Sequence, residues 1–202
     1  INTLKGNKNW MSAHEARLSD DYFSTFIDDL KPIINENDSD SAALDSVMEL
    51  LVHTNRSLPM AKIIMIPEAW AHRKDFSTKL KDLYAYANAV MEPWDGPAAI
   101  CASHTDWAIA GMDRNGLRPL RYIQTEDLLI VGSETGMVDI DEKLIKEKGR
   151  VGPGQMIAVN FKNKKFYKDE EIKSFLASSK PFGKWVKKIT HIDKLVQSAE
   201  EI

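Results

Sequence analysis

The stretch at 113–119 holds the densest group of residues that could do chemistry in this 202-residue sequence. Asn115-Gly116 is the strongest short signal for a hairpin turn, because both residue types tolerate positive φ. Asp113, Arg114 and Arg118 crowd charge around that turn, which a turn alone does not require. The residues by themselves leave two interpretations open: a tight turn between two strands, or a charged segment beside a site.

A second candidate is Asp40, which lies in a polar loop directly before a segment with helical spacing. Its structural role would be to cap that helix, a role that Ser39 could also fill. Its functional role would be to hold a cation, such as the α-ammonium group of an amino acid, in a charge-assisted hydrogen bond. Composition alone does not separate the two roles.

The other reactive side chains give no sign of a catalytic or metal site. Cys101 is the only cysteine and lies in an apolar run, so we expect a buried strand residue with no adjacent cation to lower its pKa. The five histidines are never three or four residues apart, so they form no local metal-binding pair. The glycines at 149–154 match neither a P-loop nor a dinucleotide-binding motif and predict a plain turn.

The elements that must position these residues divide into a helical first half and a strand-rich second half. Apolar residues at helical spacing predict helices at 9–18, 20–34, 42–53, 76–91, 169–177 and 183–196, an acidic start predicts one at 139–148, and 58–66 is a short buried segment of either type. Short runs bounded by turn residues predict antiparallel strands joined by hairpins at 98–103, 107–112, 120–124, 128–132, 155–161 and 165–167. The sequence therefore predicts an α+β layered domain with antiparallel sheets.

The bulk composition argues against several classes of partner. Hydrophobic residues make up 43% and charged residues 28%, as in ordinary globular proteins. The net charge of -3 gives no electrostatic reason to expect nucleic acid or a membrane surface, and the lysines at 162–168 are typical of a solvated hairpin face. The longest apolar stretch, at 61–67, is far too short to span a bilayer. A single cysteine excludes an internal disulfide and fits a reducing compartment.

Several motifs occur in a characteristic order along the chain. They are Ile-Asn-Thr-Leu-Lys-Gly-Asn at 1–7, Ser-Asp-Ser at 39–41, Ser-Leu-Pro at 57–59, Ile-Pro-Glu-Ala-Trp at 66–70, Met-Glu-Pro-Trp-Asp-Gly-Pro-Ala-Ala at 91–99, Asp-Arg-Asn-Gly-Leu-Arg-Pro at 113–119, Ser-Glu at 133–134 with Gly136, Glu-Lys-Gly-Arg at 147–150 and Pro-Gly at 153–154. Together they resemble the class II glutamine amidotransferase (glutaminase) domain in the large (α) subunit of glutamate synthases. The motif at 113–119 is shared with other class II amidotransferases, such as amidophosphoribosyltransferase, whereas the opening and the run at 92–97 are more specific.

This resemblance implies a fold and a reaction. The fold would be part of an N-terminal-nucleophile hydrolase, a four-layer αββα sandwich with two antiparallel sheets between layers of helices. In that family an N-terminal cysteine attacks the side-chain amide of L-glutamine with its own α-amine as base, and an asparagine and a glycine form the oxyanion hole. The ammonia released then reaches a flavin domain, where it serves the reductive amination of 2-oxoglutarate to L-glutamate.

Carried over residue by residue, the resemblance assigns one substrate-binding residue, Asp40, which would hold the α-ammonium group of L-glutamine. The nucleophile and the oxyanion Asn-Gly would both precede Ile1, so no catalytic residue and no metal ligand are assigned, and we expect the chain by itself to be inactive. Residues 1–185 would form the C-terminal portion of the amidotransferase domain, and 186–202 would begin the connection to the next domain. The motif at 113–119 carries over as sheet framework without a catalytic role.

The resemblance also implies cofactors and partners outside this chain. FMN and an iron–sulfur cluster would lie in other domains of the large subunit, and a small subunit or ferredoxin would be a partner of the whole enzyme. Unpaired sheet edges predict self-association or marginal stability, and the location would be a bacterial cytoplasm or a plastid. Two alternatives stay open: a non-catalytic amino-acid-binding fragment built around Asp40, and a fragment of another class II amidotransferase, against which the run at 92–99 argues.

Overall fold

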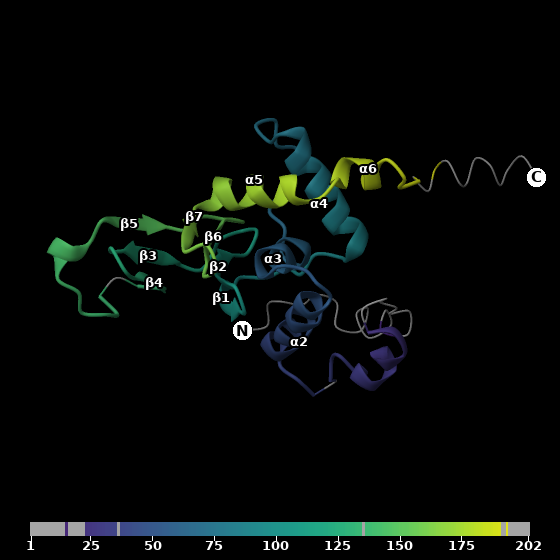
Figure 1. The fold of residues 1–202 in the computed structure, drawn as a ribbon, viewed down its shortest axis with the longest axis horizontal. Helices are drawn as coiled ribbons and strands as arrows, with labels where there is room; N and C mark the ends of the chain where they lie inside the picture. The colour runs from purple at the N-terminus through teal and green to yellow at the C-terminus, as the bar shows by residue number, and fades with distance from the viewer. Residues whose placement is uncertain (1–14, 16–22, 36, 135, 191–192, 194–202) are drawn as a thin grey trace, which may run out of the picture.

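The computed structural model describes residues 15, 23–35, 37–134, 136–190 and 193. Its helical elements are η1 (Ser24–Leu30), α2 (Asp40–His53), α3 (Leu58–Met65), α4 (Thr78–Val90), η2 (Glu142–Leu144), α5 (Asp169–Ser179) and α6 (Phe182–Val186). Its strands are β1 (Ala99–His104), β2 (Trp107–Met112), β3 (Arg121–Gln124), β4 (Leu129–Gly132), β5 (Glu147–Arg150), β6 (Met156–Asn160) and β7 (Lys165–Tyr167). In Figure 1, α2, α3, α4 and α6 lie to the right of the strands, and α5 runs above β6 and β7.

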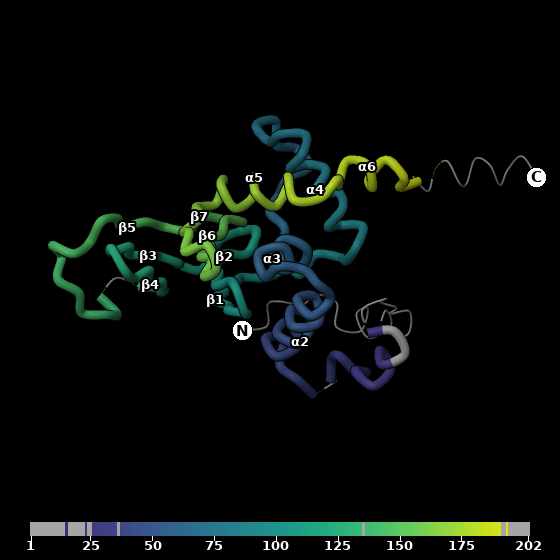
Figure 2. The backbone as a smooth tube through the Cα atoms, in the orientation of Figure 1, coloured from purple at the N-terminus to yellow at the C-terminus, as the bar shows by residue number. Residues whose placement is uncertain are grey.

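The strands form two antiparallel sheets. One has four strands in the order β1-β2-β6-β7, and the other has three in the order β4-β3-β5. The β1–β2, β3–β4 and β6–β7 pairs join strands that are consecutive in the chain, as the sequence predicts for hairpins. The tube in Figure 2 follows the chain from β2 in the first sheet into β3 in the second.

Alternation along β2 divides the interior into two cores. Trp107 and Ile109 pack into the larger core, which lies between the helices and one face of the four-stranded sheet. Ala110 and Met112 pack into the smaller core, shared with residues of β3 and of its neighbours in the second sheet. Successive side chains of a strand point to opposite faces, so the described residues stack as helices, sheet and sheet. The predicted α+β class with antiparallel sheets is confirmed, and the described residues form three layers.

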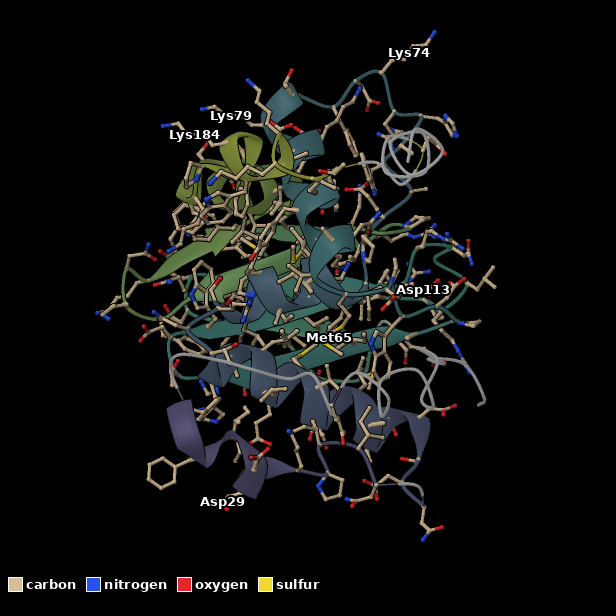
Figure 3. The ribbon with its side chains drawn as sticks, turned by 90° about the vertical axis from the view of Figure 1, so that its right-hand side faces the viewer. Asp29, Met65, Lys74, Lys79, Asp113 and Lys184 are labelled. Atoms are coloured by element: carbon tan, nitrogen blue, oxygen red, sulfur yellow. The ribbon has the colours of Figure 1, made fainter. Side chains whose placement is uncertain are left out.

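The helix layer follows from local signals in the sequence. Ser39 and Ser77 accept backbone N–H bonds from the first turns of α2 and α4, which are the caps that start these helices. Helix α3 is buried along its whole length, which is why periodicity could not assign the apolar segment at 58–66 to helix or strand. Figure 3 shows Met65, the last residue of α3, between helices and strands at the centre of the molecule.

Four predicted features differ from the structure. The helix predicted at 139–148 is wrong: only the single turn η2 forms there, because β5 pairs along its length with β3. The segment at 113–119 is a crossing between the two sheets and not a tight hairpin. Cys101 is exposed on β1, which is an edge strand. Helix α6 ends at Val186, short of the predicted 196.

Other predicted elements lie partly outside the described residues. The helices predicted at 9–18 and 20–34 are described only at Glu15 and from residue 23 onward, where the 3-10 helix η1 forms. Residues 191–192 and 194–202 also lie outside the described part. The predicted helix at 169–177 is confirmed as α5, and the lysines at 162–168 lie on an exposed hairpin face, as expected.

Gly154 and Gly136 allow a matched test of the packing between the helices and the turn before β6. Both have positive φ, +68° and +83°, but a Cβ on Gly154 would lie 2.3 Å from Glu68 Cβ, whereas no described heavy atom lies within 4 Å at Gly136. We expect Gly136→Ala to lower the free energy of unfolding by about 1 kcal/mol through backbone strain alone. Gly154→Ala should lower it by at least about 2 kcal/mol more, because it adds overpacking. Urea unfolding measures both, and equal losses would show that Glu68 gives way freely.

Candidate functional site

Asp40 is the first residue of α2, and the structure separates its two predicted roles. The cap is Ser39, whose Oγ accepts the Ala42 N–H at 3.2 Å and lies 3.0 Å from Ser41 Oγ. The Asp40 side chain is half-buried and makes no hydrogen bond or ion pair with another residue in the described part of the chain. The carboxylate is therefore not used by the fold at this helix start and is free to bind a ligand.

A cavity of about 1100 Å³ lies beside Asp40. Its walls are residues 39–42 with Leu44, Asp45 and Met48 of α2, residues 97–102 at the start of β1, residues 118–119, and residues 133–134 after β4. Among the described residues, three carboxylates and one guanidinium line it, those of Asp40, Asp45, Glu134 and Arg118. This described lining carries more negative than positive charge, which suits a small zwitterion whose ammonium group meets a carboxylate.

Asp113 shapes the segment that brings Arg118 to this cavity. Its carboxylate accepts three backbone N–H groups: those of Asn115 at 2.8 Å and Gly116 at 3.0 Å on one oxygen, and that of Ala98 at 2.9 Å on the other. Three donors satisfy a carboxylate that is only 1% exposed. Figure 3 shows Asp113 at one side of the strands. The charged motif thus serves the turn and the cavity wall together.

Arg114 and Gly116 complete this frame. The Arg114 guanidinium donates to Asp95 at 2.9 Å, which links the motif at 113–119 to the motif at 91–99. Gly116 has φ +64° and packs so closely on Pro153 that a Cβ would lie 2.6 Å from a proline ring carbon. The motifs at 91–99 and 113–119 are therefore in contact, and the motif at 153–154 supplies the surface against which the turn at Gly116 packs.

A buried charge network joins α5, α4 and the loop after α3, and the sequence interpretation missed it. Lys173 Nζ of α5 lies 2.5 Å from a Glu68 oxygen and 2.7 Å from an Asp169 oxygen. The Tyr84 hydroxyl donates to the same Glu68 oxygen at 2.5 Å. Lys62, in α3, donates to the Gly154 carbonyl at 3.3 Å. The one available signal was a lysine inside the apolar run at 58–66.

Burial perturbs the titration of two members of this network. Loss of solvation and the neighbouring Lys173 charge lower the pKa of Lys62 from 10.5 to about 8, against the opposing pull of Asp169, Glu68 and Asp113. Burial raises the pKa of Tyr84 well above its ordinary value, assisted by the Glu68 carboxylate. Tyr84 is thus a fixed hydrogen-bond donor, whereas Lys62 is a buried amine whose pKa is lowered to about 8.

Cys101 and the described histidines, His53, His72 and His104, show no catalytic geometry. Partial burial raises the pKa of the Cys101 thiol, which is the opposite of what nucleophilic activation requires. The rings of His53 and His104 meet edge to face, with centroids 5.3 Å apart. The described residues contain no group of three or more His, Cys, Asp or Glu side chains that could hold a metal ion. Within the same residues, none of the helices has the length and apolar character needed to cross a membrane.

Comparison with known proteins places this frame in a family. The family model for glutamine amidotransferases class-II matches residues 1–185. The chain belongs to the class-II glutamine amidotransferases. A solved structure similar to this class-II chain is the glutamine phosphoribosylpyrophosphate amidotransferase of B. subtilis, with a TM-score of 0.42 and 19% identity over 83% of this chain and 28% of that one.

Curated relatives of this class-II amidotransferase carry glutamate synthase names. The NADPH large chain of Azospirillum brasilense is 52% identical over 98% of this chain and 13% of the relative. A ferredoxin-dependent enzyme of Synechocystis is 45% identical over 93% and 12%, and the NADH enzyme of Saccharomyces cerevisiae is 40% identical over 100% and 9%. The chain therefore spans about an eighth or less of the length of these relatives.

The depressed pKa of Lys62 predicts a pH dependence of stability. The folded protein releases the Lys62 proton near pH 8 and the unfolded chain near 10.5, so the unfolded state binds more protons between these values and stability rises with pH there. Relative to Lys62→Gln, the wild type should gain about 3 kcal/mol in free energy of unfolding between about pH 7 and 10.5. Urea unfolding across that range measures the difference, and parallel pH curves would contradict the assignment.

Proposed function

We propose that this chain is part of the glutaminase domain of a glutamate synthase and that Asp40 binds the α-ammonium group of L-glutamine. One observation carries the proposal: the Asp40 carboxylate lines a cavity large enough for an amino acid. The carboxylate does not cap α2, because Ser39 fills that role. The names of the NADPH, NADH and ferredoxin-dependent relatives support the parent enzyme. Their agreement also disfavours an amidotransferase of another pathway.

The proposed reaction is hydrolysis of the glutamine side-chain amide, which yields glutamate and ammonia for the reductive amination of 2-oxoglutarate. Residues of this chain bind and orient the substrate: Asp40 holds one end, and the frame built on Asp113 fixes the opposite wall. We infer that Cys101 is not the nucleophile, because partial burial raises the pKa of its thiol and no described charge opposes that rise. We infer that the nucleophile and the oxyanion donors come from parts of the domain outside the described residues.

The remaining assignments follow from the parent enzyme. Residues 1–185 belong to the amidotransferase domain, and 186–202 begin the connection to the next domain. FMN and an iron–sulfur cluster reside in parts of the large subunit that this chain does not span, and a small subunit or ferredoxin delivers electrons there. We place the protein in a bacterial cytoplasm, in keeping with the 52% identity to the Azospirillum brasilense chain.

Calorimetry with L-glutamine tests the role of Asp40. Asp40→Asn keeps the shape of the side chain but removes the charge that meets the α-ammonium group. We expect its affinity to fall about tenfold to a hundredfold, the loss of a charge-assisted hydrogen bond of about 1.5–3 kcal/mol. Asp45→Asn is the matched control, because it removes the same charge from the same helix and cavity wall. Its affinity should stay within about threefold of wild type.

A ligand change sharpens the test. Glutaramic acid keeps the carboxylate and the amide of glutamine but lacks the α-amine, so it cannot form the proposed contact. We expect it to bind the wild type and Asp40→Asn equally. Glutamine binding that survives Asp40→Asn, or that Asp45→Asn weakens just as much, would reject the assignment of Asp40.

A further inference from the structure

Lys62 carries an ionisable amine in the protein interior, where an unpaired charge lowers the stability of the fold. It is 1% exposed, in a helix whose eight residues are all buried. Lys173 takes both nearby carboxylates, those of Glu68 and Asp169, and no described carboxylate lies within ion-pair distance of Lys62. A buried ammonium without a paired anion lowers stability. Among the described residues, its amine donates one hydrogen bond, to the backbone carbonyl of Gly154.

That carbonyl belongs to a turn that is tied to the cavity wall. The Gly154 N–H donates to the Asp113 carbonyl at 2.8 Å. The Asp113 carboxylate in turn holds the N–H groups of Gly116 and Ala98. Ala98 lines the cavity of Asp40, as does Arg118, two residues beyond Gly116. A continuous path of hydrogen bonds therefore runs from Lys62 to the wall that faces α2.

The charges around Lys62 come from three directions. Helix α5 presents Lys173 and Asp169, the loop after α3 presents Glu68, and the end of β2 presents Asp113. Lys173 disfavours a proton on Lys62, and the three carboxylates favour it. On the sheet side, Gly111 leaves room for the lysine stem: a Cβ there would lie 3.0 Å from Lys62 Cε. The opposing influences leave both protonation states of this amine populated near pH 8.

We propose that Lys62 is a positioning residue for the amino-acid cavity, because its protonated amine fixes Gly154 and, through Asp113, the wall opposite Asp40. Amino-acid affinity at Asp40 then falls when Lys62 loses its proton, since a charge-assisted hydrogen bond is about twice as strong as a neutral one. By reciprocity, a bound amino acid holds the proton on Lys62. The inference rests on the proposed function of the cavity.

The first experiment is L-glutamine calorimetry on the 202-residue chain between about pH 6.5 and 9.5, a range that brackets the pKa of Lys62. Lys62→Gln keeps a polar N–H group, one bond closer to the backbone than the lysine amine, but carries no titrating charge. Because the ligand ammonium also titrates, the readout is the ratio of wild-type to Lys62→Gln affinity at each pH. We expect this ratio to be about tenfold near pH 7 and to approach one above pH 9. A ratio that does not change with pH would overturn the proposal.

Lys79→Gln is the matched control for loss of a lysine. Lys79 is an exposed residue at the start of α4, and Figure 3 shows it on the outer surface, away from Asp113. Its pH profile for glutamine affinity should follow that of wild type. A Lys79→Gln profile that matches Lys62→Gln would mean that net charge, and not the path through Gly154, sets the affinity, and would reject the proposal.

The second experiment separates Lys62 from the proposed function. Backbone amide resonances of Asn115, Gly116 and Gly154 are followed against pH by NMR without ligand. We expect a common midpoint near pH 8 in wild type, flat profiles in Lys62→Gln, and a higher midpoint when glutamine is added. If glutamine binds no variant at any pH, the proposed function fails, while the ligand-free profiles still decide the coupling. Wild-type amide resonances that do not shift with pH would contradict the Lys62 proposal even where glutamine binds. This measurement uses the wild-type protein alone, so it does not depend on whether a variant folds.

Discussion

The buried carboxylate of Asp113 is the point on which the arrangement of sheets and cavity depends. One oxygen closes the turn that leaves β2, and the other holds Ala98 at the start of β1. Its backbone carbonyl accepts the Gly154 N–H before β6. One residue thus ties together three strands of the same sheet at the place where the chain leaves for the second sheet. A carboxylate can be buried here because backbone donors replace its water.

The two buried lysines show how differently one fold can treat the same charge. Lys173 forms ion pairs with the carboxylates of Glu68 and Asp169, and the Glu68 carboxylate also accepts a hydrogen bond from the Tyr84 hydroxyl. The pair with Glu68 joins α5 to the loop after α3. Lys62 instead donates to the Gly154 carbonyl and is repelled by the positive charge of Lys173. The first arrangement satisfies its charges and needs no further explanation. The buried charge of Lys62 carries an electrostatic penalty that an apolar side chain in α3 would have avoided. This penalty is consistent with a role for Lys62 in positioning the wall of the cavity.

Local signals predicted much of this fold, and contacts between distant residues account for the rest. Capped, periodic segments became α2 and α4, and short runs between turn residues became strands. The acidic segment at 139–148 looked helical by itself, but pairing of β5 with β3 fixed it as a turn and a strand, since ladder hydrogen bonds outweigh weak helix propensity. The exposure of Cys101 follows from the edge position of β1, which no local pattern reveals. The partners of Lys62 likewise lie far away in sequence.

The sequence singles out Asp40, but it does not show that the Asp40 carboxylate makes no hydrogen bond or ion pair in the described part of the chain. The pattern Ser-Asp-Ser offers three side chains able to cap a helix, and only geometry shows that Ser39 takes the first-turn N–H while Asp40 lines the cavity. This division has a physical logic. The positive end of α2 favours an anion in its first turn, so the helix stabilises the carboxylate to which we assign ligand binding, without making a hydrogen bond that a ligand would have to break. A carboxylate engaged in the cap would have to exchange that bond for a ligand ammonium, and the exchange would cancel most of the gain in binding energy.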